Sequence, residues 1–446
     1  MSTLVQENTR IIPDRQNNLT REQKEAVGLL SIGIFLEYFD MMLYVHLAVL
    51  LNELFFPKYE AFAASMLTAF AFCSTFVFRP IGALIFGYIG DRAGRKATVI
   101  ITTIMMAISC VIMANVPTYA QIGIAASIII TVCRVLQGMS SVGEIVGAEL
   151  YLTETIKPPI QYPAVAFIAV ASVIGTTTAL GVASFVTSPY GFNWRLAFWL
   201  GAAIALVGSV ARTTLRETPE FADAKRRIKK VFEETNNDIA SLEDNPIWQK
   251  KVNKKSVLYL FIVNCVWPGC FYFAYVHCGS LLKSSFGYSA EQVIHQNFIV
   301  SMIQLAAMLF ISYLSYRIYP LKILKVKVVI FSIFILFSPY ILDNITEPFY
   351  LFLFQTFLAM FAIGRVPAAS IFFRHFPVFK RYTYNSMIYA VSRALMYVIT
   401  SFGILFLTKY LGHWGLLIIM VPINVGFAFA LRHFQKLEQE AGIYVE

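Results

Sequence analysis

Long apolar stretches alternate with short polar segments along the whole chain, and this alternation predicts membrane-spanning helices. One span of a bilayer needs about 20 mostly apolar residues. Twelve such stretches occur, at residues 27–55, 62–88, 97–115, 120–151, 161–187, 194–212, 256–284, 291–316, 325–343, 348–373, 383–408 and 413–433. We therefore predict an all-α, polytopic membrane fold of twelve transmembrane helices in two six-helix halves.

The longest polar interruption divides the chain into parts. We expect a polar N-terminal segment at 1–25, a six-helix bundle at 26–212, a central loop at 213–255, a second six-helix bundle at 256–434 and a tail at 435–446. The central loop is rich in Lys and Arg, which predicts a solvated linker that touches lipid head groups. A regulatory docking site is the alternative for this loop.

The composition agrees with a membrane protein. Of the 446 residues, 58% are hydrophobic and 14% are charged, whereas soluble domains carry about 25% charged residues. The net charge of +10 does not indicate a nucleic-acid partner, because the basic residues sit in short segments between apolar stretches. The six cysteines lie in apolar stretches without zinc-site spacing, so we expect neither a disulfide framework nor a metal site.

Lys and Arg are concentrated in alternate polar segments, which predicts the orientation. Both termini and the central loop fall on the basic side, and the other side carries only Lys58, Arg195, Lys283 and Lys409. Basic segments face the cytoplasm. We therefore expect a multi-pass protein of the cell membrane, such as a bacterial inner membrane, with both termini in the cytoplasm.

The two halves show signs of an internal repeat. Arg134 in Cys133-Arg134-Val135 corresponds to Arg365 in Gly364-Arg365-Val366, at an offset of 231 residues. Arg92 after the second span corresponds to Arg317 after the eighth, at an offset of 225 residues. Repeated halves with a binding site between them are typical of secondary transporters.

The first span carries two carboxylates on one helix face. Glu37 and Asp40 are three residues apart, and Tyr44 lies four residues further along the same face. Two close carboxylates in apolar surroundings repel when both are ionised. At least one is therefore expected to bind a proton reversibly, although a structural pair held by an arginine is the alternative.

The fourth span carries a polar stripe. Arg134, Gln137, Ser141 and Glu144 are spaced by three, four and three residues, which places them on one helix face. Such a stripe is expected to face a cavity, with packing between helices as the alternative. Arg134 and Glu144 are about 15 Å apart along the axis and cannot pair directly. We expect the carboxylates of the first span to be candidate partners of Arg134.

In the second half, the charged candidates are Arg365 and Arg393. Together with Arg134 they could bind an anionic group of a solute, whereas pairing with backbone carbonyls is the alternative. Two proline positions predict interruptions of helices: Trp267-Pro268-Gly269 in the seventh span and Pro367 in the tenth.

The segment after the second span, Gly87-Tyr88-Ile89-Gly90-Asp91-Arg92-Ala93-Gly94-Arg95-Lys96, predicts a conformational latch. Gly87 and Gly94 permit a tight turn and close helix approach. Asp91 can accept hydrogen bonds from a helix N-terminus, and Arg92 and Arg95 can anchor at the membrane surface.

Signals for enzymatic chemistry are missing from the sequence. It contains no Gly-x-x-x-x-Gly-Lys-Ser/Thr loop and no His-Glu-x-x-His pair, and no Ser-His-Asp set can be assembled. We expect a protein that is not an enzyme and uses no cofactor.

These motifs resemble the major facilitator superfamily. Gly87–Lys96 is similar to its loop motif, and Arg134-x-x-Gln137-Gly138 is similar to the fourth-helix motif of proton-coupled members. Leu36–Asp40, Arg134–Glu144, Asn193–Trp199 and Leu215–Pro219 resemble the metabolite–proton symporter branch, which includes proline/betaine, 2-oxoglutarate, citrate and shikimate carriers.

The second half departs from that branch. Tyr316–Pro320 lacks the Asp and Gly of the loop motif, and Arg374-His375 stand before Phe376-Pro377 where the branch commonly has an acidic residue.

The resemblance implies proton-coupled symport of a small zwitterionic or carboxylate solute by alternating access. Glu37, Asp40 and Glu144 would bind the proton, and Tyr44, Arg134, Gln137, Ser141, Arg365 and Arg393 would bind the solute. We expect a monomer whose partners are solute, proton and bilayer. An exporter of siderophores or drugs and a transport-inactive sensor are the alternatives.

Overall fold

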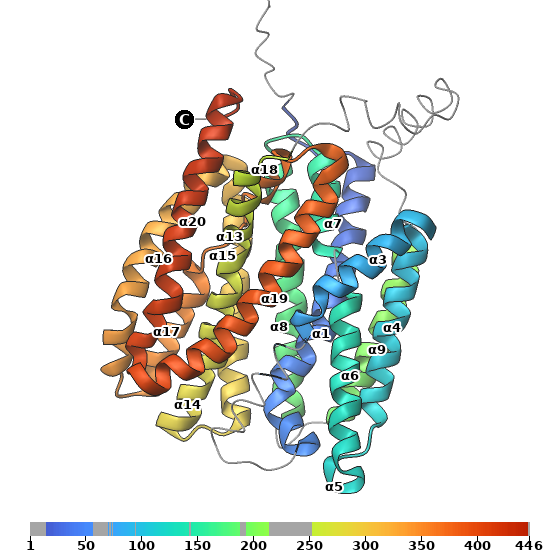
Figure 1. Cartoon of the computed structure of the whole chain (residues 1–446), viewed down its shortest axis with the longest axis vertical. Helices are drawn as coiled ribbons and strands as arrows, with labels where there is room; N and C mark the ends of the chain where they lie inside the picture. The colour runs from blue at the N-terminus through green and yellow to red at the C-terminus, as the bar shows by residue number, and fades with distance from the viewer. Residues whose placement is uncertain are drawn as a thin grey trace, which may run out of the picture.

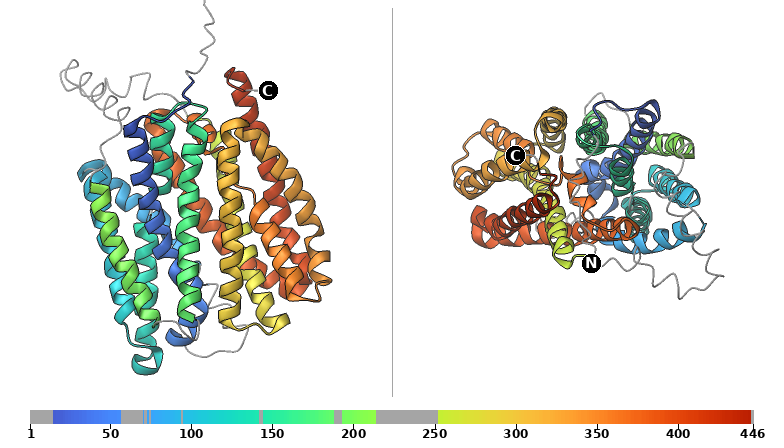
Figure 2. Two further views of the ribbon diagram at one scale, coloured as in Figure 1. Left: turned by 180° about the vertical axis from the view of Figure 1, so that it is seen from behind. Right: turned by 90° about the horizontal axis from the view of Figure 1, so that it is seen from above.

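The fold is a bundle of long helices that run side by side (Figure 1). The computed structural model describes residues 15–56, 75–93, 95–141, 144–187, 193–213 and 252–444, together with residues 70 and 73. Seen along the bundle, the helices separate into an N-terminal and a C-terminal group (Figure 2). The described N-terminal end and the end of the last helix lie at the same end of the bundle, which we call the terminal end.

The N-terminal half is built around two close helix pairs. Helix α1 packs along α8, and α4 packs along α9. Its elements are α1 (Arg21–Phe55), α3 (Arg79–Ala93), α4 (Arg95–Asn115), α5 (Tyr119–Ile122), α6 (Ile124–Ser140), α7 (Glu144–Thr155), α8 (Gln161–Thr187) and α9 (Trp194–Thr213).

The C-terminal half contains two breaks in its helices. Its elements are α13 (Lys254–Phe271), the π-helix η1 (Tyr272–His277), α14 (Cys278–Phe286), α15 (Ala290–Arg317), α16 (Pro320–Asp343), α17 (Pro348–Phe361), α18 (Ala369–Arg374), α19 (Val378–Leu411), the 3₁₀ turn η2 (Gly412–Trp414) and α20 (Gly415–Glu440). The halves meet where α8 packs on α15 and α3 packs on α19.

The predicted all-α membrane fold is confirmed. Helix occupies most of the described residues in each of the twelve expected spans, and the largest exception is the stretch 362–368 in the tenth span. Six described segments are long and apolar enough to cross a membrane, and the longest of these, Lys380–Glu440, contains both α19 and α20, which are joined by η2. Large apolar side chains such as Leu84, Phe310 and Val326 are exposed on the outside, as expected of helices that face lipid. The central loop between 213 and 252 lies outside the described residues, and the domain boundaries stay a prediction.

Both predicted helix interruptions are present. Pro268 lies near the end of α13, and the helix continues as η1 rather than unwinding. Proline lacks the N–H that an α-helix needs at this point. Side chains satisfy two carbonyls of η1: Gln355 donates to Ala274 at 2.8 Å and Asn297 donates to Tyr275 at 3.3 Å. In the tenth span, α17 ends at Phe361 and α18 begins only at Ala369, beyond Pro367.

Candidate functional site

A cavity lies between the two halves, with an empty volume of about 960 Å³ counted out to its open side. Ligand sites of transporters lie in this position, between repeated halves. The N-terminal half contributes residues of α1, α3 and α8, and the C-terminal half contributes residues of α13, α16 and α19. The central residues are Tyr38, Phe76, Arg79, Asn264, Trp267, Gln304, Lys327, Arg365, Tyr389, Arg393 and Tyr397.

Among the described residues, four cationic side chains line this cavity. Arg79 comes from the N-terminal half, and Lys327, Arg365 and Arg393 come from the C-terminal half. Arg79 is 3% exposed and Lys327 is 8% exposed. The Lys327 ammonium donates to the carbonyl of Ala362 at 2.7 Å, in the break between α17 and α18. The cations therefore lie away from bulk water. A charged side chain in such a place is costly unless it has a partner or a function.

Aromatic rings separate and support these cations. The guanidinium carbons of Arg365 and Arg393 lie 4.6 Å and 4.8 Å from the centroid of the Tyr389 ring. The hydroxyls of Tyr389 and Tyr38 are 3.0 Å apart across the two halves. Arg393 also donates to the Tyr397 hydroxyl at 3.4 Å. The arrangement fixes the cavity-facing arginines against rigid rings.

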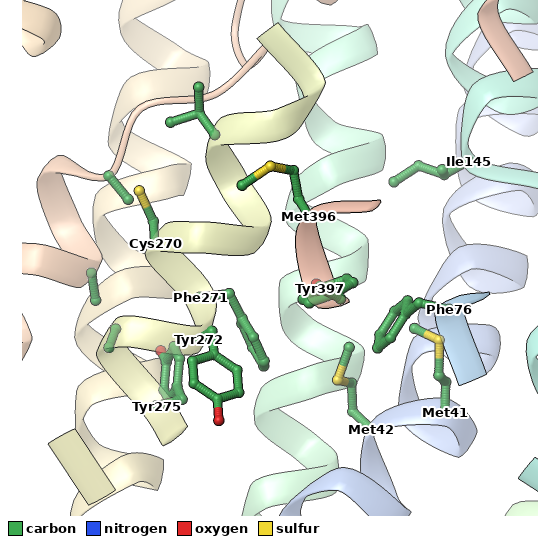
Figure 3. Packing of buried hydrophobic residues seen from close by; sticks show 14 of the residues in the cluster. Met41, Met42, Phe76, Ile145, Cys270, Phe271, Tyr272, Tyr275, Met396 and Tyr397 are labelled. Atoms are coloured by element: carbon green, nitrogen blue, oxygen red, sulfur yellow. The ribbon is translucent and has the colours of Figure 1, made fainter. Parts of the chain in front are cut away.

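The other wall of the cavity is apolar. Phe76, in the helical turn before α3, faces Tyr397 of α19 with ring centroids 3.8 Å apart. Figure 3 shows this pair with Met42 and Phe271 nearby. Arg79 lies over Phe76 with its guanidinium carbon 4.8 Å from the ring centroid. The cavity therefore combines charged groups with an aromatic wall.

A buried ion pair joins the halves beside the cavity. Glu149 of α7 is 0% exposed and Arg365 is 8% exposed. The Arg365 Nη2 lies 2.9 Å from both carboxylate oxygens of Glu149, and its Nε donates to Oε1 at 3.3 Å. Arg365 Nη1 donates to Asn264 at 3.2 Å. One arginine therefore touches the cavity and the opposite half at the same time.

A second ion pair joins the halves nearer the terminal end. Arg381 of α19 donates to Glu154 of α7 at 3.0 Å, and both side chains are mostly buried. Helix α7 thus contacts the C-terminal half through two carboxylates that are five residues apart. Breaking both pairs is a requirement for the two halves to separate at this end.

The polar stripe predicted in the fourth span packs inside the N-terminal half. Arg134 is 1% exposed, and its guanidinium carbon lies 4.2 Å from the centroid of the Tyr44 ring. Arg134 donates to Gln137 at 3.0 Å and to the carbonyl of Met41 at 3.3 Å. Met41 itself lines the cavity. Arg134, Gln137 and Tyr44 are brought together one residue away from the cavity, and their role in solute binding stays a prediction.

The remaining predicted residues are distributed as follows. Ser141 is buried, and its hydroxyl donates to the carbonyl of Gly138 at 3.1 Å. Glu37 and Asp40 are buried in α1, next to the cavity-lining Tyr38 and Met41. Helix α7 begins at Glu144 beside the cavity-lining Ile145, but the Glu144 side chain lies outside the described residues. Their part in proton coupling stays a prediction.

Two of the predicted solute-binding residues, Arg365 and Arg393, line the cavity. For the predicted latch, Gly87, Asp91 and Arg92 lie in α3 and Arg95 begins α4. The side chains of these residues and Gly94 lie outside the described part of the chain, so the latch stays a prediction.

Lys327 was not among the predicted site residues. It lies at the start of the expected ninth span, 325–343, inside α16, and it lines the cavity. Lys325 and Lys327 are both helical, and two residues correspond to about half a turn. Lys325 therefore faces elsewhere, near the ring of Tyr444.

A polar cluster closes the terminal end of the C-terminal half. Glu438 of α20 is 0% exposed and pairs with Arg374, and it accepts hydrogen bonds from Tyr319 and, at 2.6 Å, from His375. Burial and then the neighbouring Arg374 lower the pKa of His375 to about 4. His375 is therefore neutral near pH 7 and donates from Nε2. Glu438 supplies the acidic group that the second loop segment lacks in sequence.

Two helical halves around a buried, charged cavity define a multi-pass membrane carrier. The sequence profile of the Major Facilitator Superfamily matches residues 30–401. The chain belongs to the Major Facilitator Superfamily, a family of secondary transporters rather than enzymes. The expected resemblance is confirmed.

Curated relatives point to metabolite transport. The inner membrane metabolite transport protein YhjE of Escherichia coli strain K12 is 35% identical over 44% of this chain and 47% of its own. The proline/betaine transporter of Salmonella typhimurium is 30% identical over 50% of this chain and 45% of its own. The matched region thus spans about half the length of these relatives.

Solved structures share the fold at low identity. The proton:xylose symporter XylE superposes with a TM-score of 0.73 at 16% identity, over 93% of this chain and 95% of its own. The human organic anion transporter MFSD10 superposes with a TM-score of 0.69 at 14% identity, over 93% of this chain and 100% of its own. At such identities the likeness concerns the fold alone.

Proposed function

We propose that this protein is a proton-coupled symporter of a small zwitterionic or carboxylate solute. It works by alternating access in a bacterial inner membrane, as a monomer with both termini in the cytoplasm. The observation that carries the proposal is the cavity between the halves, which is lined by cations from both of them. A carboxylate bound there contacts both halves, so its binding energy favours one of their relative positions.

The proton-coupling step is assigned to the carboxylates of the N-terminal half. Glu37 and Asp40 lie in the same helix as Tyr38 and Met41, which line the cavity. Glu144 begins the helix that carries Glu149. Protonation of this group removes negative charge beside the cavity and changes which conformation is favoured. The proline/betaine transporter among the relatives supports a zwitterionic solute.

The test uses purified protein in proteoliposomes. Uptake of labelled proline, betaine and organic acids is measured with and without an inward proton gradient. We expect accumulation of at least one solute that depends on the gradient, and Asp40→Asn abolishes or uncouples it. Asp343→Asn, which changes an exposed carboxylate at the end of α16, leaves it unchanged. Equal uptake with and without the gradient contradicts coupling, and outward accumulation would instead indicate an exporter.

A further inference from the structure

Charge in the cavity is unbalanced. Of the four cations that line it, only Arg365 has a carboxylate partner among the described residues. No Asp or Glu among the described residues lines the cavity. The Nε atoms of Arg79 and Arg393 are buried without a hydrogen-bond partner in the described part of the chain. Buried donors of this kind are costly unless a ligand satisfies them.

The hydrogen-bond acceptors of Arg79 and Lys327 are uncharged and do not neutralise these cations. Arg79 donates to the thioether sulfur of Met41 at 2.5 Å, and a thioether is a weak acceptor. Lys327 is held by a neutral carbonyl. A solute with a single carboxylate can satisfy only one part of this cluster.

Two of the aromatic rings that line the cavity, Phe76 and Tyr389, already have cations beside them. Quaternary ammonium groups bind over the faces of several rings. In this cavity, the Tyr389 ring lies beside the guanidinium groups of Arg365 and Arg393, and the Phe76 ring lies beside Arg79 and Tyr397. At these two rings a betaine-like cation would meet positive charge.

We propose that the solute is an organic anion with two or more carboxylate groups, and that one of them takes Arg365 from Glu149 while Lys327 and Arg393 hold another. This inference rests on the proposed function, because it takes the cavity as the solute site. It narrows the solute class and adds Lys327 as a binding residue and Glu149 as a gating residue.

The ion pair with Glu149 links solute binding to the gate. Arg365 bonds to Glu149 of the opposite half while it lines the cavity. A solute carboxylate and Glu149 therefore compete for one guanidinium group. When the solute displaces Glu149 from Arg365, one of the two ion pairs described between α7 and the C-terminal half is lost, and Glu154–Arg381 is the one that remains among the described residues.

The first test measures the affinity of the full chain in detergent, by calorimetry, for succinate, butyrate and glycine betaine. Succinate and butyrate both have four carbons and differ in one carboxylate. We expect succinate to bind most tightly. Lys327→Met lowers succinate affinity by about tenfold or more, which is the effect of losing one hydrogen bond to a charged group, and changes butyrate affinity less. Lys325→Met, two residues away on the same helix, leaves both unchanged.

The second test uses the competition. Glu149→Gln removes the charge that competes for Arg365, so succinate affinity rises several-fold. Glu154→Gln also removes an ion pair between the halves but does not touch the cavity, so it leaves affinity unchanged. Loss of succinate affinity in Glu149→Gln, or equal effects of both variants, would overturn the gating role.

The outcomes separate this inference from the proposed function. Tighter binding of betaine or butyrate than of succinate, or no binding of succinate, overturns the inference even if gradient-driven uptake of another solute is observed. Succinate binding that responds to Lys327→Met supports it even if uptake does not depend on a proton gradient, and in that case the coupling fails instead.

Discussion

Replacing Glu438 with glutamine tests the polar cluster at the terminal end. The substitution keeps the side-chain size and the capacity to accept from Tyr319, but it removes the charge that faces Arg374. Arg374 is 20% exposed and His375 is 15% exposed, so little water is present to replace the carboxylate.

The expected cost follows from this burial. Removing one partner of a buried ion pair destabilises a protein by about 3–5 kcal/mol, and the partial exposure of Arg374 places the cost at about 3 kcal/mol. The entropy of unfolding is about 2.1 cal/mol/K per residue. For 446 residues, this cost therefore lowers the melting midpoint by roughly 3 °C.

The assay is thermal unfolding of the purified protein in detergent. Glu440→Gln is the control, because Glu440 lies on the same helix and its side chain is 58% exposed, 3.8 Å from Lys436. We expect a change close to zero for the control. If Glu438→Gln melts at the same temperature as Glu440→Gln, the cluster does not stabilise the C-terminal half and this reasoning fails.

Two further substitutions test packing and pH dependence. Gly138→Ala places a methyl group against the backbone carbonyl of Thr75, where α6 meets the turn before α3, and we expect a loss of stability of about 1–3 kcal/mol. The control is Gly28→Ala, whose added methyl group meets nothing within 4 Å. Equal melting temperatures of the two variants would contradict the close approach of α6 to this turn. His375→Gln is expected to reduce the loss of stability on acidification. Because the pKa of His375 is lowered to about 4, the unfolded chain binds the proton first, so stability present above pH 6.5 is lost as the pH falls towards 4, at about 1.4 kcal/mol per pH unit. Between pH 6.5 and pH 5 the wild type should lose about 2 kcal/mol more than the variant, and parallel pH profiles would refute this assignment.

The helices could be predicted from the sequence because the signal is local. Each span can be recognised from the length of its own apolar stretch. Pro268 and Pro367 interrupt their helices because proline itself lacks the backbone N–H. Helix α16 begins at Pro320, five residues before the expected start of the span. The start was missed because Lys322, Lys325 and Lys327 make this stretch polar. A hydropathy pattern cannot distinguish a buried lysine from one at the surface.

The candidate site was only partly predictable because its pairs are remote in sequence. Arg365 was found as an intramembrane cation, but its partner Glu149 is 216 residues away. In the sequence, Glu149 had no feature that set it apart from Glu154, since both lie close to the end of the expected fourth span at residue 151. Glu438 lies in the expected tail, and only the packing of α20 against α18 and the loop before α16 gives it a buried role.

The most direct test of the central claim is whether solute entry moves protons. Proteoliposomes without any imposed gradient are loaded with a pH-sensitive dye, and the solute that binds best is added outside. The account predicts acidification of the interior that saturates with solute concentration, is lost in Asp40→Asn and is missing from empty liposomes. Accumulation of labelled solute with no change in internal pH would contradict it.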